Sequence, residues 1–434
     1  MRQTRSRAAR GATLASVAAA GALLMAGCAP AEETPTLTWY TNPDDGGQAE
    51  IAKICTDAAD GRYTIETSML PNDAASQREQ LTRRLAAGDT SMDIMSLDPP
   101  FIPELAEPGF LAPVPQDVQE HAKVNTLEGA LAGAMWKDTM VSVPFWANTQ
   151  LLWYRKSVAE EAGLDMSQPV TWDQLIEAAR QTDTELGVQG NRAESMTVWV
   201  NALVEGGGES IIADPAAPAD EVQTNLDSEA GRKAAEIIST IGREGLGSAG
   251  LPTQAENESM LLFQGDTGSF MVNWPFVWPA TLKSAESGAL PADLPEDIGW
   301  AMYPQTMEGQ EAAPPLGGIN LGVGAKSAHQ DLAYDAISCI TSAENQALYF
   351  KDNGNPAADP KAYEDPEVLE QYPMAPLVRD SLDQAAPRPQ TPYYNEVSTA
   401  IQLSFTPPSA VDPATTPAAT DQFIEEVLRG ERLL

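Results

Sequence analysis

The chain has 434 residues, of which 43% are hydrophobic and 20% charged, and because single hydrophobic cores stop growing near ~250 to 300 residues, this length predicts two lobes. The formal net charge of −36 argues against nucleic acid and anionic lipid headgroups as partners. With two histidines and three cysteines the chain lacks the residues of a zinc cluster, so we expect neither a metal site nor a cofactor.

The N-terminus has the pattern of a secretory signal peptide. Its apolar run, Gly11 to Met25, is too short to span a membrane and follows four arginines, Arg2, Arg5, Arg7 and Arg10. The run ends in LMAGC, which resembles the bacterial lipobox. We therefore expect a signal peptide over residues 1–27, lipidation of Cys28, a tether over 28–36 and anchoring to the outer face of the cell membrane. The alternative is an ordinary signal peptide that contains a cysteine.

Strand and helix signals alternate in the first part of the chain. Strands are predicted at Leu37–Tyr40, Tyr63–Met69 and Met92–Leu97, with a helix at Gln77–Ala87 that Gly88 stops. This alternation predicts a parallel α/β lobe, with Asp98 at the tip of its third strand.

A second α/β unit is predicted to open with an apolar strand at Leu151–Tyr154. Thr171 and Gln174 form a capping box, and Asp227 or Ser228 caps the helix that runs to Ile241. Further on, a strand at Leu316–Val323 is followed by two helices, Asp331–Thr341 and Glu344–Lys351.

One apolar stretch, FMVNWPFVWP at Phe270–Pro279, combines a buried strand with two prolines that end it. It sets Asn273, Trp274 and Trp278 at the open end of a strand, where α/β folds bind ligands, and an indole suits the apolar face of a sugar ring. The alternative is a Trp-Pro corner of the core.

Two cysteines beyond Cys28, namely Cys55 and Cys339, lie on apolar faces of helical patterns. They could pair outside the cytoplasm, where disulfides persist, or remain buried free thiols.

Several motifs in order resemble those of one family. They are the lipobox, SLDPPF at 96–101, NTQLLWYRK at 148–156, VNWPFVW at 272–278, GGINL at 317–321 and RPQTPYY at 388–394. The chain resembles ABC-importer solute-binding lipoproteins of the maltose-binding-protein superfamily and, within it, the actinobacterial trehalose-binding LpqY-type proteins. The resemblance runs from about Leu37 to the C-terminus.

This resemblance implies an α/β fold of the periplasmic-binding-protein type II. Two lobes, residues 37–147 with 316–352 and residues 148–315 with 353–434, are joined by a hinge, with a ligand cleft between them. It implies a monomer that binds a disaccharide, with trehalose favoured, and delivers it to the permease subunits of an ABC importer. It also places Cys55 and Cys339 on helices of one lobe, where a disulfide would join its separate segments.

The resemblance further implies a set of ligand residues. They are Asp45, Asp98, Asn148, Glu256, Trp274, the backbone of Gly317 and Gly318, and Arg388. Asp44 competes with Asp45, and Glu258 with Glu256. The set is chemically sensible, because carboxylates, an amide and a guanidinium can each hold two neighbouring sugar hydroxyls while an indole covers the C–H face.

Two other classes of function compete with a sugar-binding protein. A surface glycoside hydrolase would use Asp98 and Glu256 as its carboxylate pair, and such a pair needs a separation that the sequence does not give. An adhesin would need exposed repeats, which the sequence lacks. We expect a protein that is not an enzyme, although residue chemistry alone does not separate trehalose from another sugar such as maltose.

Overall fold

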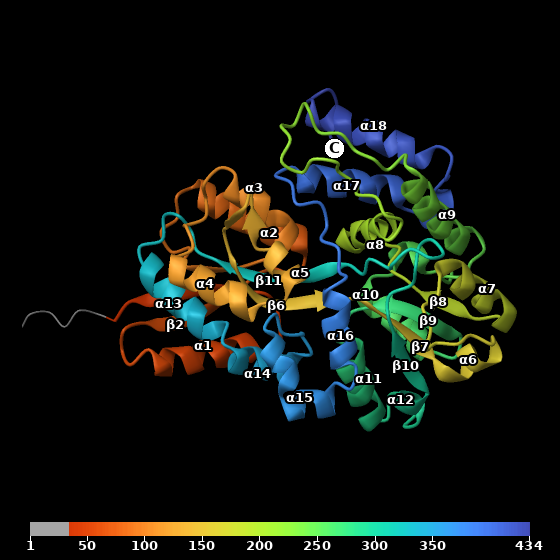
Figure 1. Cartoon of the computed structure of the whole chain (residues 1–434), viewed down its shortest axis with the longest axis horizontal. Helices are drawn as coiled ribbons and strands as arrows, with labels where there is room; N and C mark the ends of the chain where they lie inside the picture. The colour runs from red at the N-terminus through yellow and green to blue at the C-terminus, as the bar shows by residue number, and fades with distance from the viewer. Residues whose placement is uncertain (1–33) are drawn as a thin grey trace, which may run out of the picture. The chain divides into compact units, whose positions relative to one another are not determined.

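The structure, a computed structural model, describes residues 34–434. The predicted signal peptide and the lipidation site at Cys28 lie outside the described residues. The chain divides into two units, Met1–Thr34 and Pro35–Leu434, and everything below concerns the second (Figure 1).

The first sheet has five strands in the order β2-β1-β3-β11-β6. Their bounds are β1 Thr36–Thr41, β2 Thr64–Met69, β3 Ile94–Leu97, β6 Val143–Thr149 and β11 Leu316–Gly322. β1 is parallel to β2 and β3, as predicted, but β11 is antiparallel to both β3 and β6. The prediction of a purely parallel lobe is therefore wrong. The chain returns to this sheet at the edge where β1 and β3 end, so β11 must run back in the opposite direction.

Helices cover this sheet on both faces (Figure 1). They include α1 Gly47–Ala58, α2 Ala74–Ala86, α13 Gln330–Ile340 and α14 Ala343–Asn353. Trp39, Phe145 and Tyr349 are among the large side chains of the core between the strands and α1, α13 and α14. Burial of such aromatic groups supplies much of the free energy that stabilises this half.

The second sheet is also mixed, with four strands in the order β10-β7-β9-β8. Its strands are β7 Leu151–Arg155, β8 Glu185–Gly187, β9 Gly268–Asn273 and β10 Ile298–Ala301. β7 is antiparallel to β9 and β10, while β8 is parallel to β9. The helices packed on it include α7 Trp172–Thr182, α8 Glu194–Glu205, α9 Glu229–Arg243, α17 Tyr394–Phe405 and α18 Thr416–Leu428.

The predicted helix caps of this half are confirmed. Thr171 Oγ1 accepts from the Gln174 amide at 3.2 Å, and Gln174 Oε1 accepts from the Thr171 amide at 2.8 Å. Ser228, not Asp227, caps α9 by accepting from the Gly231 amide at 3.2 Å. These bonds satisfy amide donors that a helix start leaves without intrahelical partners.

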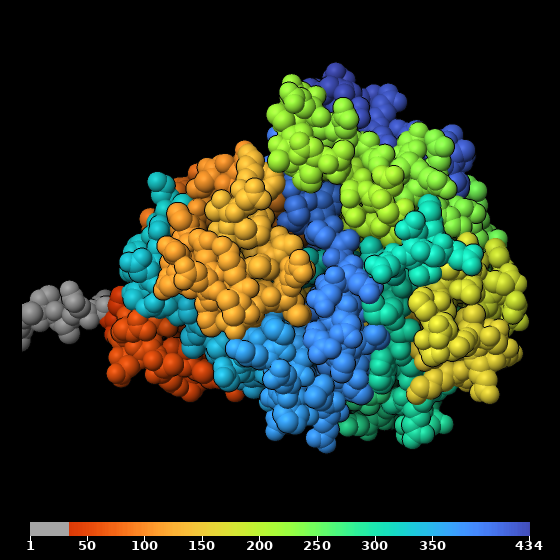
Figure 2. Space-filling view, viewed as in Figure 1, coloured from red at the N-terminus to blue at the C-terminus, as the bar shows by residue number. Residues whose placement is uncertain are grey.

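The chain passes between the two sheets more than once. Only Gln150 separates β6 in the first sheet from β7 in the second, and β11 brings the chain back. After α14, the short helices α15 Pro366–Gln371 and α16 Ala375–Leu382 pack in a core cluster with residues of both sheets, such as Ala147 and Met271. The blue strip between the orange and the green regions of Figure 2 includes α16.

The remaining elements are connecting pieces. They are α3 Ile102–Ala106, α4 Gln116–Asn125, α5 Glu128–Ala132, β4 Met135–Trp136, β5 Thr139–Met140, α6 Lys156–Glu161, α10 Glu256–Gln264, α11 Val277–Glu286, α12 Leu294–Asp297, and the 3-10 turns Pro99–Phe101, Leu251–Thr253, Pro360–Glu364 and Pro408–Ala410. No helix that the structure describes is long and apolar enough to cross a membrane.

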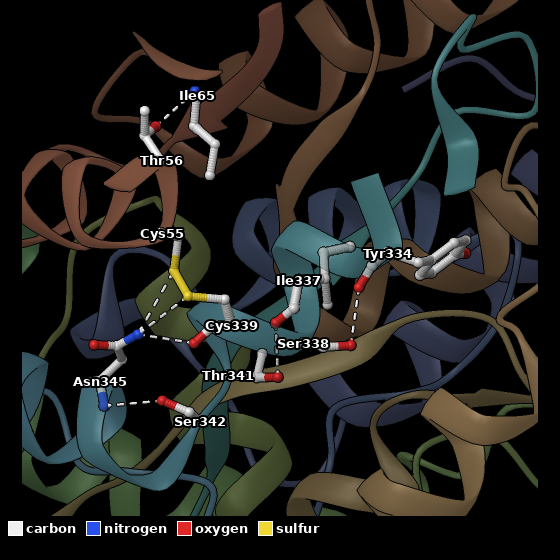
Figure 3. The surroundings of a disulfide bond; sticks show 10 residues. All are labelled: Cys55, Thr56, Ile65, Tyr334, Ile337, Ser338, Cys339, Thr341, Ser342 and Asn345. Carbon is white, nitrogen blue, oxygen red and sulfur yellow. Dashed lines mark hydrogen bonds between the residues drawn. A yellow bond between two sulfur atoms is a disulfide. The ribbon is translucent and has the colours of Figure 1, made fainter. Parts of the chain in front are cut away.

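Cys55 of α1 and Cys339 of α13 form a disulfide, 284 residues apart in sequence (Figure 3). The Asn345 side-chain amide lies against both sulfurs and donates to the Cys339 carbonyl at 2.8 Å. In the chain-entropy view, closing so long a loop in the unfolded chain contributes ~2 to 5 kcal/mol to stability. The bond therefore joins the first segment of this half to the segment that returns after the second sheet.

The burial of Glu205, the last residue of α8, can be tested by measuring how the stability of the protein depends on pH. Burial raises the pKa of Glu205 to about 7 from 4.5, with a hydrogen bond from Ser210 acting against it. The folded state therefore favours the protonated acid, and stability falls as pH rises from about 4.5 through about 7. We expect Glu205→Gln to be more stable than wild type above pH 7, by roughly 1 to 3 kcal/mol, and similar near pH 4. Urea unfolding across pH measures this.

The control is Glu221→Gln, which removes the same charge from an exposed position and should leave the pH profile of wild type unchanged. A Glu205→Gln variant whose stability follows the wild-type profile at every pH would contradict the expectation.

Candidate ligand-binding site

A cavity of about 630 Å³ is lined by residues from both sheets. Within the first sheet, the lining residues gather at one edge, where the parallel strands β1 and β3 end. Open α/β sheets place ligands at this edge, because loops there leave the backbone in a crevice outside the strands.

The first sheet contributes polar groups at strand ends. Asn42 follows β1, Asp98 follows β3, Asn148 lies near the end of β6, and Gly317 and Gly318 lie near the start of β11. Because β11 is antiparallel to its neighbours, its beginning lies at the edge where β6 ends, with Gly317 opposite Asn148. Asn148 is 9% exposed, and its Oδ1 accepts from the Thr149 amide at 3.0 Å.

The half around the second sheet contributes residues at helix starts and after β9. Glu194 begins α8 and Glu256 begins α10, while Trp274 directly follows β9. A carboxylate in the first turn of a helix interacts favourably with the positive end of the helix dipole. Burial raises the pKa of Glu256, and hydrogen bonds from its own backbone amide and from the Trp274 side chain oppose the rise.

Two glycines at the start of β11 allow close approaches, Gly317 to the Trp274 indole and Gly318 to the backbone of β6. A Cβ on Gly317 would lie 3.0 Å from the Trp274 ring, so a side chain there would displace the indole. Gly318 has φ +112°, and a Cβ there would lie 2.3 Å from the Trp146 carbonyl oxygen. The absence of a side chain at Gly317 thus lets Trp274 of one half lie against the backbone of the other.

Arg388 forms ion pairs with one carboxylate from each half of the protein. Its Nη2 donates to Asp98 Oδ1 and its Nη1 to Glu194 Oε1, each at 2.6 Å. The Arg388 side chain is only 5% exposed, and those of Asp98 and Glu194 are 19% and 23% exposed, so this is a largely buried ion triplet in which the guanidinium has lost most of its water. Such a group is held by its internal pairing, since each charge alone would be costly to bury.

Burial and the neighbouring charges shift the pKa values of Arg388 and Asp98 in this triplet. Burial acts to lower the pKa of Arg388, but the facing carboxylates outweigh burial and raise it well above its usual value. Burial raises the pKa of Asp98, the attraction of Arg388 opposes the rise, and the Glu194 charge adds to it. Arg388 therefore stays a cation throughout the accessible pH range.

Seven residues of the predicted ligand set line this cavity together: Asp98, Asn148, Glu256, Trp274, Gly317, Gly318 and Arg388. Asp45 does not. Its side chain is exposed beside a turn at Gly46, which has φ +103°. Asp44 is no substitute, because its carboxylate accepts from the Gly46 and Gln48 amides at the start of α1. Asn42 and Pro43, just before them, line the cavity instead.

Neighbouring residues in the Glu256 and Trp274 segments differ in whether they reach the cavity. Glu258 is exposed, and its carboxylate accepts from the Ala255 amide at 3.0 Å, so Glu256 is the acid that reaches the cavity. Asn273 is fully buried and donates to the Glu256 carbonyl, while Trp278 donates to the Gln371 carbonyl. The expectation that Asn273 and Trp278 share a ligand face with Trp274 is therefore wrong, because the chain turns into α11 after Pro275.

Several lining residues had no place in the predicted set. They are Asn42, Asn72, Asp73, Gln77, Trp146, Asn191, Glu194, Tyr349 and Asn355, among others. Asn42 follows a strand as Asp98 does, and the same rule would have found it. Glu194 carries no comparable signal, because its role depends on Arg388, which is 194 residues away.

Residues 52–347 match the model of the family described as bacterial extracellular solute-binding protein. The chain belongs to this family. Its members bind solutes and are not catalysts, so the chain is a binding protein and not an enzyme.

A relative from Deinococcus radiodurans, a probable ABC transporter-binding protein, is 24% identical over 378 residues, which are 81% of this chain and 84% of the relative. The mannitol-binding protein of Pseudomonas aeruginosa is 26% identical over 186 residues, 42% of this chain and 41% of that protein.

Solved structures show the same fold. Maltose-bound MalE3 of T. maritima superposes with a TM-score of 0.75 at 24% identity, covering 92% of this chain and 100% of that one. The GacH receptor of Streptomyces glaucescens gives 0.72 at 19% identity, covering 92% and 98%. The predicted fold class, a type II periplasmic-binding-protein fold with two α/β lobes, is confirmed.

The ion triplet gives a stability test. Replacing Arg388 by Met leaves the Asp98 and Glu194 carboxylates buried without their cation, so we expect the free energy of unfolding at pH 7 to fall by ~3 to 5 kcal/mol. Adding Asp98→Asn should recover part of the loss. The deficit should shrink toward pH 4, where the unpaired Asp98 carboxylate, whose pKa is raised by burial, takes up a proton. Denaturant unfolding measures all three effects.

The control is Arg180→Met, because Arg180 pairs with Glu244 in a much more exposed bridge and should contribute no more than ~1 kcal/mol. Equal losses for the Arg388 and Arg180 variants would mean that the triplet does not stabilise the fold as described.

Proposed function

We propose that this protein is the substrate-binding subunit of a carbohydrate ABC importer and that its cavity binds a disaccharide, trehalose before others. The observation that carries the proposal is the pairing of one indole, Trp274, with carboxylate, amide and guanidinium groups around one space. An aromatic face covers the C–H side of a sugar ring, and the polar groups meet the hydroxyls at its edge.

The dimensions of the cavity are consistent with this ligand class. Its volume of about 630 Å³ falls within the range of ~300 to 1,000 Å³ typical of small-molecule sites. The solved relatives in this fold include proteins bound to maltose, acarbose, D-mannitol and ribitol. These ligands share many hydroxyls and little else, which supports a polyhydroxylated ligand here.

The preference for trehalose rests on the motifs that resemble trehalose-binding proteins. Asp98, Asn148, Trp274 and Arg388 stand in those motifs and line the cavity. Maltose is the second candidate, because both sugars present two glucose rings with similar hydroxyls. We propose lobes of residues 37–147 with 316–352 and 148–315 with 353–434, supported by the direct passage from β6 to β7.

We further propose that the protein acts as a monomer, anchored through a lipid on Cys28 and delivering the sugar to permease subunits. The LMAGC sequence before and including Cys28 supports the anchor. Mass spectrometry of the mature N-terminus should find an acylated Cys28, and Cys28→Ala should leave the membrane fraction. An unmodified N-terminus at another residue would refute the anchor while leaving sugar binding untouched.

The sugar proposal is tested by thermal unfolding and calorimetry. A ligand at a hundred times its Kd, bound only by the folded form, stabilises the protein by ~2.7 kcal/mol. Trehalose should therefore raise Tm clearly, maltose and sucrose less, and glucose little, and the sugar should be recovered intact. Trp274→Ala should weaken binding by ~1.5 to 3 kcal/mol, because the apolar face of the ring loses its platform.

The matched control is Trp278→Ala, which removes an indole from the same segment outside the cavity and should leave the affinity near that of wild type. A larger Tm shift with another disaccharide would change the ligand within the proposal. A protein that responds to no sugar, or a Trp274→Ala variant that binds like wild type, would overturn it.

A further inference from the structure

The charged groups that line the cavity are strongly unequal in number. Four carboxylates, on Asp73, Asp98, Glu194 and Glu256, face a single guanidinium, on Arg388. A guanidinium is the group that recognises the carboxylate of a uronic acid or the phosphate of a sugar phosphate, through its planar fork of donors. Whether the cavity binds an anionic sugar therefore depends on whether the N–H donors of Arg388 are already hydrogen-bonded to protein carboxylates.

Both terminal nitrogens of Arg388 already donate to protein carboxylates. Nη1 donates to Glu194 Oε1 and Nη2 to Asp98 Oδ1, each at 2.6 Å. With two negative charges in contact with one positive charge, the triplet as a whole is negative. An anionic ligand entering here meets repulsion, and it must displace a carboxylate to reach the fork.

The two carboxylates are not equivalent. Glu194 is held on all sides within the second half: its Oε1 also accepts from the Tyr394 hydroxyl, and its Oε2 accepts from Ser398 Oγ at 2.8 Å. Tyr394 is fully buried and Ser398 is 3% exposed. Among the described residues, by contrast, no hydrogen bond goes to Asp98 Oδ2, so Asp98 keeps a whole carboxylate oxygen for sugar hydroxyls, while both oxygens of Glu194 already accept hydrogen bonds from protein groups.

We infer that Glu194 is a specificity-determining residue that occupies and neutralises Arg388, so that the cavity accepts neutral sugars and rejects anionic ones such as uronates and sugar phosphates. Glu194 acts through Arg388 and positions it, without needing to touch the ligand. This inference rests on the proposed function in that the cavity binds a neutral disaccharide.

The first experiment compares two nearly isosteric ligands by calorimetry: trehalose, and trehalose in which one C6 hydroxymethyl group has been oxidised to a carboxylate. Wild type should prefer the neutral sugar by about a hundredfold or more. Glu194→Gln keeps the size and the acceptor oxygen but removes the charge, and it should reduce this preference at least about tenfold. Should the Gln variant fail to fold, Glu194→Ala tests the same point.

Two matched variants separate the role of Glu194 from cavity charge in general. Asp73→Asn removes one negative charge from the same lining but touches no part of the triplet, and an asparagine can still accept from the Ser76 amide at the start of α2. Its preference should fall by less than that of Glu194→Gln, because Asp73 makes no contact with Arg388. In Glu194→Gln/Arg388→Met, the gain for the uronate should vanish, because the guanidinium is gone.

A second readout needs no sugar. Inorganic phosphate at constant ionic strength should raise the Tm of Glu194→Gln, because one of the two negative charges that neutralise Arg388 is gone, but not the Tm of wild type or of Asp73→Asn. If no sugar binds wild type and this phosphate effect still appears, the proposed function fails and the role of Glu194 stands. The inference is overturned if wild type binds the uronate as tightly as trehalose. It is equally overturned if Glu194→Gln changes neither readout, or if its effect persists without Arg388.

Discussion

The buried contact of Arg388 with Asp98 and Glu194 is the interaction on which the site depends. Asp98 belongs to the end of β3 in the first sheet, Glu194 to the start of α8 beside the second, and Arg388 to a loop that follows both in sequence. These three largely buried charges must stay together, because losing the guanidinium would leave two carboxylates uncompensated in a medium of low polarity. The triplet therefore fixes where three distant segments meet, and the cavity forms around that meeting point.

The apolar side of the site depends on a glycine, because a side chain at that position would displace the Trp274 indole. Gly317 leaves the start of β11 without a side chain there, so the Trp274 indole from the opposite half can lie against its backbone. The cavity is thus bounded by an ionic contact, involving Arg388, and by an apolar contact, involving Trp274. A sugar has the matching division of surface, with hydroxyls at the ring edge and C–H groups on its face.

Negative charge predominates both over the whole chain and among the residues that line the cavity. The whole chain carries a formal net charge of −36, and the cavity lining also has more carboxylates than cations. At the surface, water and salt screen these charges, and their effect is mainly on solubility and choice of partner. Within the cavity, screening is weaker, and the same sign of charge becomes a filter for the ligand.

The sequence by itself determined the features that depend on neighbours along the chain. The strands β1, β2, β3 and β9 and the caps at Thr171 and Ser228 could be predicted, because periodicity and capping chemistry are local signals, and the motifs contain most of the predicted residues that line the cavity. Only the tertiary structure decided the direction of β11, the absence of Asp45 and Trp278 from the cavity lining, and the contact of Glu194 with Arg388. These features depend on contacts between segments up to hundreds of residues apart. A local sequence pattern does not show which of several similar side chains will meet when those segments pack together.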